Sequence, residues 1–124
     1  MKALSIRQPW ADLIVDGKKS IETRKWNTHY RGWFYIHASQ KAEKSVCDEY
    51  GVKPSATGAV IGKAFLYDVK KYTSKREWDA DLPVHYAKIM AKPTMYGFLV
   101  RDPQRIKPVP CKGRLSWWEF NNRR

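Results

Sequence analysis

The sequence predicts one mixed α+β domain, residues 1–124, in which strands outnumber helices and wrap into a compact mixed β-barrel with short flanking helices. Its length of 124 residues suits a single domain, and 43% hydrophobic with 14% aromatic residues is enough for a substantial core. Apolar residues recur more often in short strand-like runs than at helical spacing. The order of these runs favours a barrel over a doubly wound parallel sheet.

The first expected elements are a strand and a helix. Residues 3–6 form a short apolar run that is typical of a strand. Trp10, Leu13 and Ile14 follow at the i, i+3, i+4 spacing of a buried helix face. Gly17 is placed to end this helix in a left-handed conformation.

The middle of the chain is expected to alternate strands with a polar helix. Residues 20–26 alternate as a half-buried strand does, and the aromatic-rich run 33–38 is typical of a central strand. Residues 41–50 are helix-like and polar. Residues 59–67 form an apolar strand in which Gly62 indicates a bend or a close approach of two backbones.

The C-terminal half begins with a helix signal and continues as strands. Ser74 and Glu77 have the spacing of a capping box, so a short helix is expected to start there. Three strands are then predicted, the first of them ended by Asp102-Pro103: residues 95–100, 105–109 and 115–120. The last residues are expected to be a polar, basic tail.

Net charge is the strongest functional signal in the composition. The chain has 24 Lys and Arg against 12 Asp and Glu, which gives a formal charge of +12. This excess favours a polyanionic partner, RNA or DNA, through phosphate contacts and counterion release. A generically basic surface is the alternative. A membrane partner is not expected, because we find no basic amphipathic helix with a continuous apolar stripe.

The cysteines and histidines point to no metal and no cofactor. Cys47 and Cys111 lack CxxC spacing, which argues against a disulfide scaffold and a structural zinc site. His29, His37 and His85 are scattered without ligand spacing. No run approaches the ~18–20 apolar residues that cross a bilayer. We therefore expect a soluble protein of the reducing cytoplasm.

The densest polar cluster lies in residues 17–24. If this segment is a strand, Glu22 and Arg24 are neighbours on one face and can hold one another, while Lys19 at the preceding turn can reach the same place. Such a cluster can grip a phosphate, hydrogen-bond a base edge or tune a lysine for catalysis. A solvated charged strand is the alternative that spacing alone leaves open.

Two stretches of the chain resemble the activating signal cointegrator homology (ASCH) family: LSIRQPWA at residues 4–11 and GKKSIETRKW at residues 17–26. The family motif G-x-K-x-x-E-x-R is matched by Gly17, Lys19, Glu22 and Arg24. The resemblance spans nearly the whole chain, and its most specific part is the N-terminal third.

The resemblance implies a PUA-like β-barrel with short helices and a cleft, between the barrel and the first helix, that binds RNA or DNA. Three groups of side chains would line this cleft: Lys19, Glu22 and Arg24 as its floor, Arg7, Gln8 and Trp10 as its wall, and His37 and Ser39 from a neighbouring strand.

Aromatic residues near the motif support single-stranded or modified-base recognition, because exposed rings stack on unpaired bases. Trp10 or Trp26 could provide that ring. The alternative for Trp10 is a core position, given its spacing with the apolar residues of the helix. The alternative for His37 is a hydrogen-bonded structural histidine.

Three functions remain open from the sequence. A nucleic-acid-binding domain is the first expectation. A small hydrolase acting on acylated nucleosides or RNA, with Lys19 and Glu22 as catalytic groups, is the second, although the amidohydrolase branch of the family implies a Thr where this chain has Glu22. Because Glu22 favours the ammonium form of Lys19, a charged Lys19 that grips phosphate is the simpler expectation. A protein-interaction adaptor with a partner in a protein complex is the third.

Overall fold

The computed structural model describes residues 1–121, so most of the predicted basic tail lies outside the described residues. The strands are β1 (Lys2–Gln8), β2 (Ile21–Arg24), β3 (Gly32–Ala42), β4 (Ala59–Tyr72), β5 (Met95–Pro110) and β6 (Trp118–Glu119). The helices are α1 (Trp10–Val15), α2 (Lys44–Glu49), α3 (Lys75–Ala80) and α4 (Leu82–His85). The mixed α+β class predicted from the sequence is confirmed.

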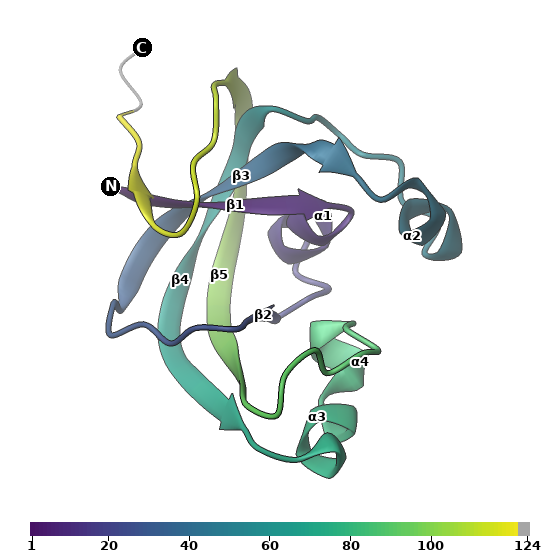
Figure 1. Cartoon of the computed structure of the whole chain (residues 1–124). Coiled ribbons are helices and arrows are strands. Elements are labelled where there is room, and N and C mark those ends of the chain that lie inside the picture. Colours follow the sequence, from purple (N-terminus) through teal and green to yellow (C-terminus); the bar gives the residue numbers. More distant parts are fainter. Residues whose placement is uncertain (122–124) are drawn as a thin grey trace.

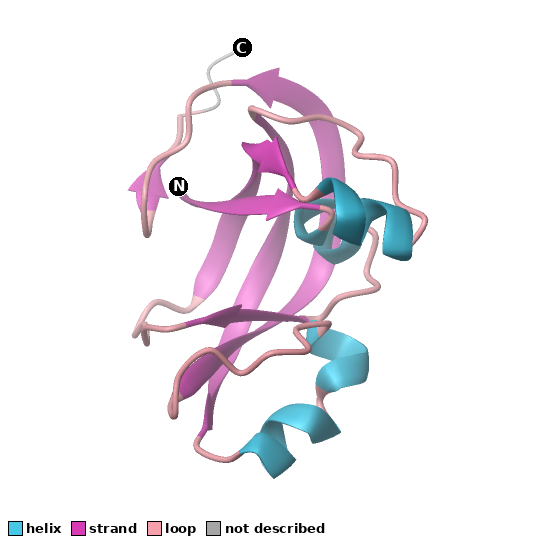
Figure 2. Ribbon diagram, turned by 45° about the vertical axis from the view of Figure 1, so that its right-hand side comes forward, coloured by secondary structure: helices cyan, strands magenta, loops and turns pink. Residues whose placement is uncertain are grey.

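One strongly curved sheet forms the body of the domain (Figures 1 and 2). Its strand order is β2-β5-β4-β3-β1-β6, with β1 and β3 parallel and the other pairs antiparallel. Within residues 1–121 no strand pairing joins β2 to β1, so the expected barrel is not closed. The sheet instead leaves a seam between these two strands.

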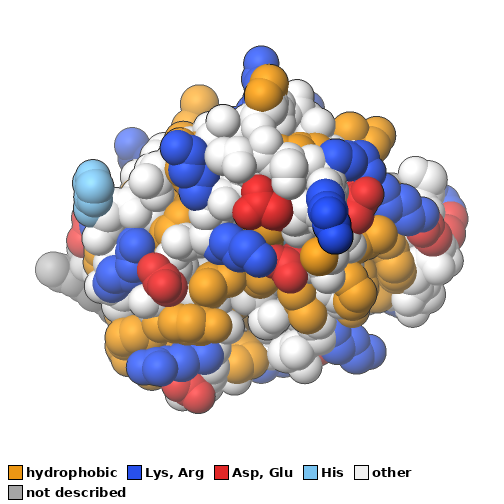
Figure 3. All heavy atoms as spheres, turned by 90° about the horizontal axis from the view of Figure 1, so that it is seen from below, with side chains coloured by type: hydrophobic (Ala, Val, Ile, Leu, Met, Phe, Trp, Pro, Cys, Tyr) orange, Lys and Arg blue, Asp and Glu red, His pale blue; other side chains and the backbone are white. Residues whose placement is uncertain are grey.

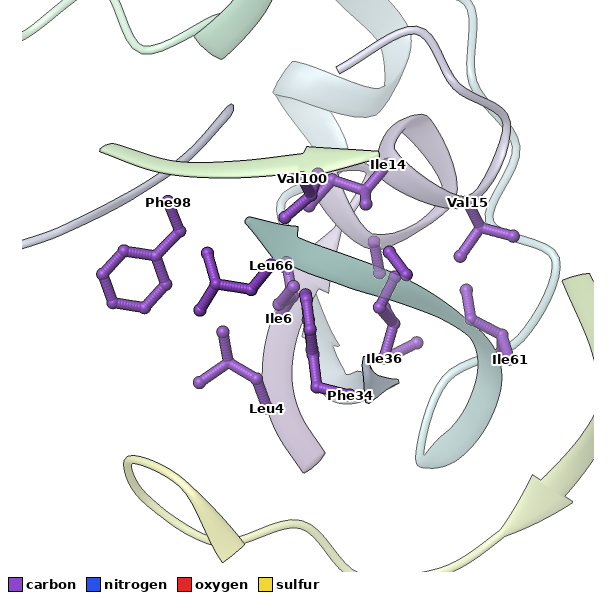
Figure 4. Close-up of a cluster of buried hydrophobic side chains, with 13 residues drawn as sticks. Leu4, Ile6, Ile14, Val15, Phe34, Ile36, Ile61, Leu66, Phe98 and Val100 are labelled. Atoms are coloured by element: carbon purple, nitrogen blue, oxygen red, sulfur yellow. The ribbon is translucent and has the colours of Figure 1, made fainter. Parts of the chain in front are cut away.

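The core fills the concave side of the sheet and fixes α1 against it (Figure 4). Leu4 and Ile6 of β1 enter this core at the two-residue period of a strand. Ile14 and Val15 enter it from α1. Because α1 is anchored in this way at its C-terminal end, Trp10, its first residue, is held at the end of β1, beside the seam.

Strand β5 is longer than the sequence predicts, because it passes through Asp102-Pro103 rather than ending there. Asp102 has a φ of 53°, and the register between β4 and β5 shifts at this point. A bulge of this kind takes Pro103 out of the hydrogen-bonded ladder, so the missing N–H costs no pairing. The expected close approach at Gly62 is confirmed: a Cβ there would lie 2.6 Å from the carbonyl oxygen of Gln104.

The helices follow their sequence signals closely. Gly17 follows α1 with a φ of +80°, as a helix-terminating glycine should. The backbone N–H of Glu77 donates to Ser74 Oγ at 3.2 Å, which confirms the predicted cap of α3. Helix α2 is shorter than the run 41–50, and of the predicted final strand only β6 forms.

Cys47 and Cys111 are free thiols. In the described part of the chain, no cluster of His, Cys, Asp or Glu side chains is arranged to hold a metal ion. Among the same residues, no helix has the length and apolar character needed to cross a membrane.

Candidate nucleic-acid interface

A pocket of about 590 Å³ occupies the seam between β1 and β2. We call it the seam pocket. Its walls come from the end of β1, the first turn of α1, strand β2 with the residues that follow it, and the loop that precedes β6. The lining residues are Ser5, Ile6, Arg7, Trp10, Glu22, Thr23, Arg24, Lys25, Trp26, Ser39, Met95, Arg114, Leu115 and Ser116.

The floor of the seam pocket is an ion pair within β2, from which one hydrogen bond crosses the seam to β1. Arg24 Nε and Nη2 donate to Glu22 Oε2 at 3.0 and 2.8 Å. Arg24 Nη2 also donates to the carbonyl oxygen of Ser5 at 3.0 Å, which ties β2 to β1. The predicted contact between Glu22 and Arg24 is therefore confirmed. The hydrogen bond from Arg24 to Ser5 joins the two strands at the point where the sheet stays open.

Lys19 lies behind this floor rather than in the pocket. Its side chain is 3% exposed, and its Nζ donates to the carbonyl oxygens of Ile21, at 2.7 Å, and His85. Glu22 Oε1 lies 3.5 Å from the same nitrogen, so the three N–H groups of the ammonium all have internal acceptors. Burial lowers the pKa of Lys19, while the charge of Glu22 opposes that shift.

The buried position of Lys19 argues against the expectation that it grips a phosphate. A buried ammonium whose hydrogens are all engaged has nothing to offer a ligand without breaking these bonds. Its physical role is to hold Glu22 in place and to join the start of β2 to the end of α4.

Two other predicted site residues are enclosed as well. Gln8 is fully buried, where its Nε2 donates to Asp12 Oδ2 and to the carbonyl oxygen of Ala56. His37 is buried, with Nε2 2.9 Å from the carbonyl oxygen of Cys111 and Nδ1 3.0 Å from Ser5 Oγ. The structure therefore places Gln8 and His37 behind the wall, and for His37 it agrees with a hydrogen-bonded structural role.

The remaining predicted residues all line the seam pocket: Arg7, Trp10, Glu22, Arg24, Trp26 and Ser39. Both tryptophans are half-buried. Trp26 also packs edge-on against Phe98 and Trp117, with ring centroids 5.3 and 6.3 Å apart. Each tryptophan therefore combines a packing contact with a surface open to the pocket.

Sequence reasoning missed the loop that closes the pocket before β6. This loop contributes Arg114, Leu115 and Ser116, and the Leu115 side chain is 94% exposed. Gly113 anchors it, because a Cβ there would lie 2.4 Å from Ser5 Oγ and 2.7 Å from His37 Nδ1. The signal in the sequence was a Lys-Gly-Arg run between apolar residues, which is typical of an exposed turn.

The pocket carries a strong positive excess at its rim. Arg7, Lys25 and Arg114 are exposed, and Arg24 is partly exposed, whereas Glu22 is the one carboxylate among the lining residues. Arg7 alone of the three exposed cations has an acidic contact in the described structure, 3.9 Å from Glu43. The seam pocket therefore combines tryptophan rings with cations at its mouth that lack an acidic partner within residues 1–121. This combination can bind a nucleotide, with its base against the rings and its phosphates beside the cations.

The family and the fold can be identified by comparison with known proteins. The ASCH domain model matches residues 4–110. The chain is 50% identical over 135 aligned positions to Activating signal cointegrator 1 of Homo sapiens and, equally, to that of Mus musculus. These alignments cover 97% of this chain and 22% of each relative, so the chain spans about a fifth of their length.

Solved structures show the same fold. The crystal structure of ASCH from Zymomonas mobilis matches with a TM-score of 0.71 at 18% identity, covering 98% of this chain and 87% of that one. A point mutant of the same protein matches with a TM-score of 0.72 at 18% identity, covering 98% and 90%. The mixed sheet with short helices is accordingly of the PUA-like type. This chain belongs to the ASCH domain family.

Proposed function

We propose that this domain binds single-stranded RNA and takes one unpaired base, plain or modified, into the seam pocket. The ASCH family is generally linked to RNA binding. The observation that carries the proposal is the composition of the pocket, where two tryptophans and four cations surround an opening of about 590 Å³. Stacking on aromatic rings and contacts to phosphates are the two forces that bind single strands.

The open edges of the sheet add hydrogen-bonding groups to this pocket. Strand β2 pairs with β5 on one side only, and in the described residues no strand pairs with its other edge. Among residues 1–121, strand β1 has no strand partner on its seam side beyond Ala3, where its pairing with β6 stops. The carbonyl oxygens of Ser5 and Ile21 already accept from Arg24 and Lys19. Other backbone N–H and C=O groups of such edges can pair with the edge of an inserted base.

The positive rim supports a path for the sugar–phosphate backbone. Lys25 follows β2, and Arg114 lies across the pocket in the loop before β6. Cations on both sides of the mouth can contact the phosphates that flank an inserted base. This arrangement predicts affinity that falls with rising salt.

The test is binding of a fluorescein-labelled, mixed-sequence single-stranded RNA, followed by anisotropy at two salt concentrations. Trp26→Ala is expected to lose about 1–3 kcal/mol of binding free energy, the usual loss of one stacked base. Trp33→Ala is the matched control, because Trp33 lies on β3 and packs on Phe65 away from the pocket lining. Arg114→Glu, which changes an exposed loop residue, checks the result in a variant that leaves the core intact. Equal losses in the Trp26 and Trp33 variants would place the RNA elsewhere.

A hydrolase acting on acylated nucleosides or RNA is the second candidate. It has one favourable observation, since burial lowers the pKa of Lys19 as a general base requires. Against it, the Lys19 ammonium already donates to two backbone carbonyl oxygens and forms an ion pair with Glu22. Incubation with acylated nucleosides and with RNA distinguishes the two functions. If the domain hydrolyses either substrate, and if Glu22→Gln abolishes that hydrolysis, the enzymatic function would replace the binding proposal.

A further inference from the structure

A second pocket, of about 350 Å³, lies on the α2 side of Trp10. We call it the aromatic pocket. Its lining includes Trp10, Glu43, Glu49, Tyr50, Tyr86 and Lys88. We propose that this pocket binds the quaternary ammonium group of a methylated lysine presented by a partner protein. The proposal is independent of RNA binding at the seam pocket.

Three aromatic rings form a corner in this pocket. The rings of Trp10 and Tyr50 have centroids 5.8 Å apart and planes inclined by 61°. Tyr86 completes the set, 5.4 Å from Tyr50 at 71° and 6.3 Å from Trp10 at 57°. Rings inclined to one another in this way present faces and edges around a shared space, which is the arrangement that surrounds a methylated ammonium group.

No cation of the described chain lies over the two tyrosine rings. Lys19 Nζ lies 5.6 Å from the centroid of Trp10, and other aromatic residues of the domain have their own Lys or Arg neighbours. Tyr50 and Tyr86 have none among the described residues, although the chain carries 24 basic side chains. Their rings remain available to a cation from outside.

The lining of the aromatic pocket has a small acidic excess, unlike the basic molecule as a whole. Glu43 and Glu49 line it together with a single ammonium, that of Lys88. Lys88 Nζ contacts Glu49 Oε2 at 2.5 Å, and Glu43 Oε2 accepts a hydrogen bond from Trp10 Nε1 at 3.3 Å. Arg7, which does not line this pocket, lies 3.9 Å from Glu43 Oε1. The lining carboxylates therefore outnumber the lining cation in a chain of net charge +12. This local reversal fits a cationic ligand and disfavours a nucleic acid.

The chemistry of the lining selects a methylated lysine over an ordinary one. An unmodified ammonium loses hydrogen bonds to water when it enters an aromatic corner, and the nearest carboxylate oxygens already have donors. A quaternary ammonium has no N–H to leave unsatisfied, keeps its positive charge and fills the corner with methyl groups. The apolar side of the opening, with Val46 and Ile89, suits the aliphatic stem of the lysine.

The backbone at Tyr86 supports a functional placement of its ring. Tyr86 has a φ of 67°, a left-handed conformation that is costly for a bulky side chain. It caps α4 in this conformation and lies against Tyr50 and Trp10. A glycine would adopt this left-handed conformation at lower cost. The presence of tyrosine instead indicates that its aromatic ring is needed at this position.

The test compares four probes on the full chain by isothermal titration, with the Trp10 indole N–H resonance as a second readout. They are a short Gly/Ser-flanked peptide containing trimethyl-lysine, its unmodified lysine counterpart, its neutral isostere with carbon in place of the quaternary nitrogen, and choline chloride. We expect the trimethyl-lysine peptide to bind roughly tenfold or more tightly than the isostere, the size of a desolvated cation–π contribution. Equal binding of the isostere or of unmodified lysine would overturn the proposal, as would binding of choline without binding of the peptide.

Two variants locate the site. Tyr86→Gly keeps the left-handed backbone and removes the ring, so it should abolish trimethyl-lysine binding with little change in thermal unfolding. Tyr50→Ala should do the same, whereas Tyr67→Ala, at a 45% exposed tyrosine on β4, is the matched control. RNA binding should survive in all three. Retained peptide affinity in both Tyr50→Ala and Tyr86→Gly would show that the aromatic pocket is not the site.

Discussion

The seam pocket and the aromatic pocket share the side chain of Trp10 in their linings but differ in their balance of charge. The seam pocket has Arg and Lys side chains around its mouth and a paired carboxylate in its floor. The aromatic pocket has two carboxylates and one ammonium around three rings. A basic net charge therefore does not describe this surface evenly. Figure 3 shows that even on one face Lys and Arg side chains are interspersed with acidic and hydrophobic ones.

The difference between the pockets comes from what supports each of them. The seam pocket is supported by buried charged side chains, among which Glu22 lies between Lys19 and Arg24. The aromatic pocket is supported by contacts among three rings: Trp10 at the start of α1, Tyr50 directly after α2 and Tyr86 directly after α4. Lys19 contributes to both, because it holds Glu22 and also donates to the carbonyl oxygen of His85, next to Tyr86.

The largest effect is expected when Lys19 is removed. Lys19→Met keeps the length of the side chain but leaves Glu22 buried beside Arg24 alone, and leaves the carbonyl oxygens of Ile21 and His85 without their donor. Removing one partner of a buried ion pair costs about 3–5 kcal/mol of unfolding free energy. Urea unfolding measures it, with Lys18→Met at the neighbouring exposed position as the control. Equal stability of the two variants would contradict the structural role of Lys19 and restore it as a ligand contact.

The tryptophan shared by the pockets gives the next effect. Trp10→Ala should weaken both RNA and trimethyl-lysine binding, each by about 1–3 kcal/mol. Trp26→Ala should affect RNA alone, since Trp26 lines only the seam pocket, and Tyr50→Ala should affect trimethyl-lysine alone. Parallel titrations of the three variants with both ligands provide the measurement. If Trp26→Ala and Tyr50→Ala each reduced both affinities, the two pockets would be one site.

Acid should loosen the aromatic pocket through His85. This residue is fully buried; Nε2 lies 2.8 Å from the carbonyl oxygen of Trp78 and therefore carries the hydrogen, while Nδ1 accepts from the N–H of Ala87 at 3.0 Å. Burial lowers the pKa of His85 and nearby Lys19 acts in the same direction, whereas Asp79 and Asp81 oppose them.

Because the unfolded chain then binds the proton more readily, stability falls as the pH drops below the ordinary histidine pKa of about 6.5, by at most ~1.4 kcal/mol per pH unit. Thermal unfolding between pH 7.5 and 5.5 should show this slope, and His85→Gln should flatten it. His29→Gln, at an exposed histidine, should leave it unchanged. An unchanged slope in His85→Gln would assign the acid sensitivity to another group.

The parts of this molecule that were predictable from sequence are the local ones. The cap at Ser74, the end of α1 at Gly17 and the contact between Glu22 and Arg24 each depend on residues a few positions apart. The burial of Lys19 was not predictable, because its acceptor at His85 lies 66 residues away along the chain.

The open seam was missed for a related reason. Whether a sheet closes depends on pairing across its two edges, here between β2 and the part of β1 that the short β6 leaves uncovered, and no single segment encodes that pairing. The aromatic pocket gave no sequence signal at all, because Trp10, Tyr50 and Tyr86 are far apart and each fits a core position equally well.

The smallest expected effect comes from removing one cation at the mouth of the seam pocket, which tests the difference in charge between the two pockets. Arg114 is exposed at the mouth of the seam pocket and has no ion-pair partner in the described structure. Arg114→Ala should reduce the slope of log affinity against log salt for RNA by about 1, the loss of one phosphate contact. Lys75 is the matched control, because its Nζ lies 2.7 Å from Asp79 on α3, outside the lining of the pocket. Trimethyl-lysine binding should keep its salt dependence in both variants, since neither residue lines the aromatic pocket. The contrary outcome is that Lys75→Ala and Arg114→Ala lower the salt dependence of RNA affinity equally. The electric field of the whole protein would then attract the RNA, and the cations at the seam pocket would make no specific phosphate contact.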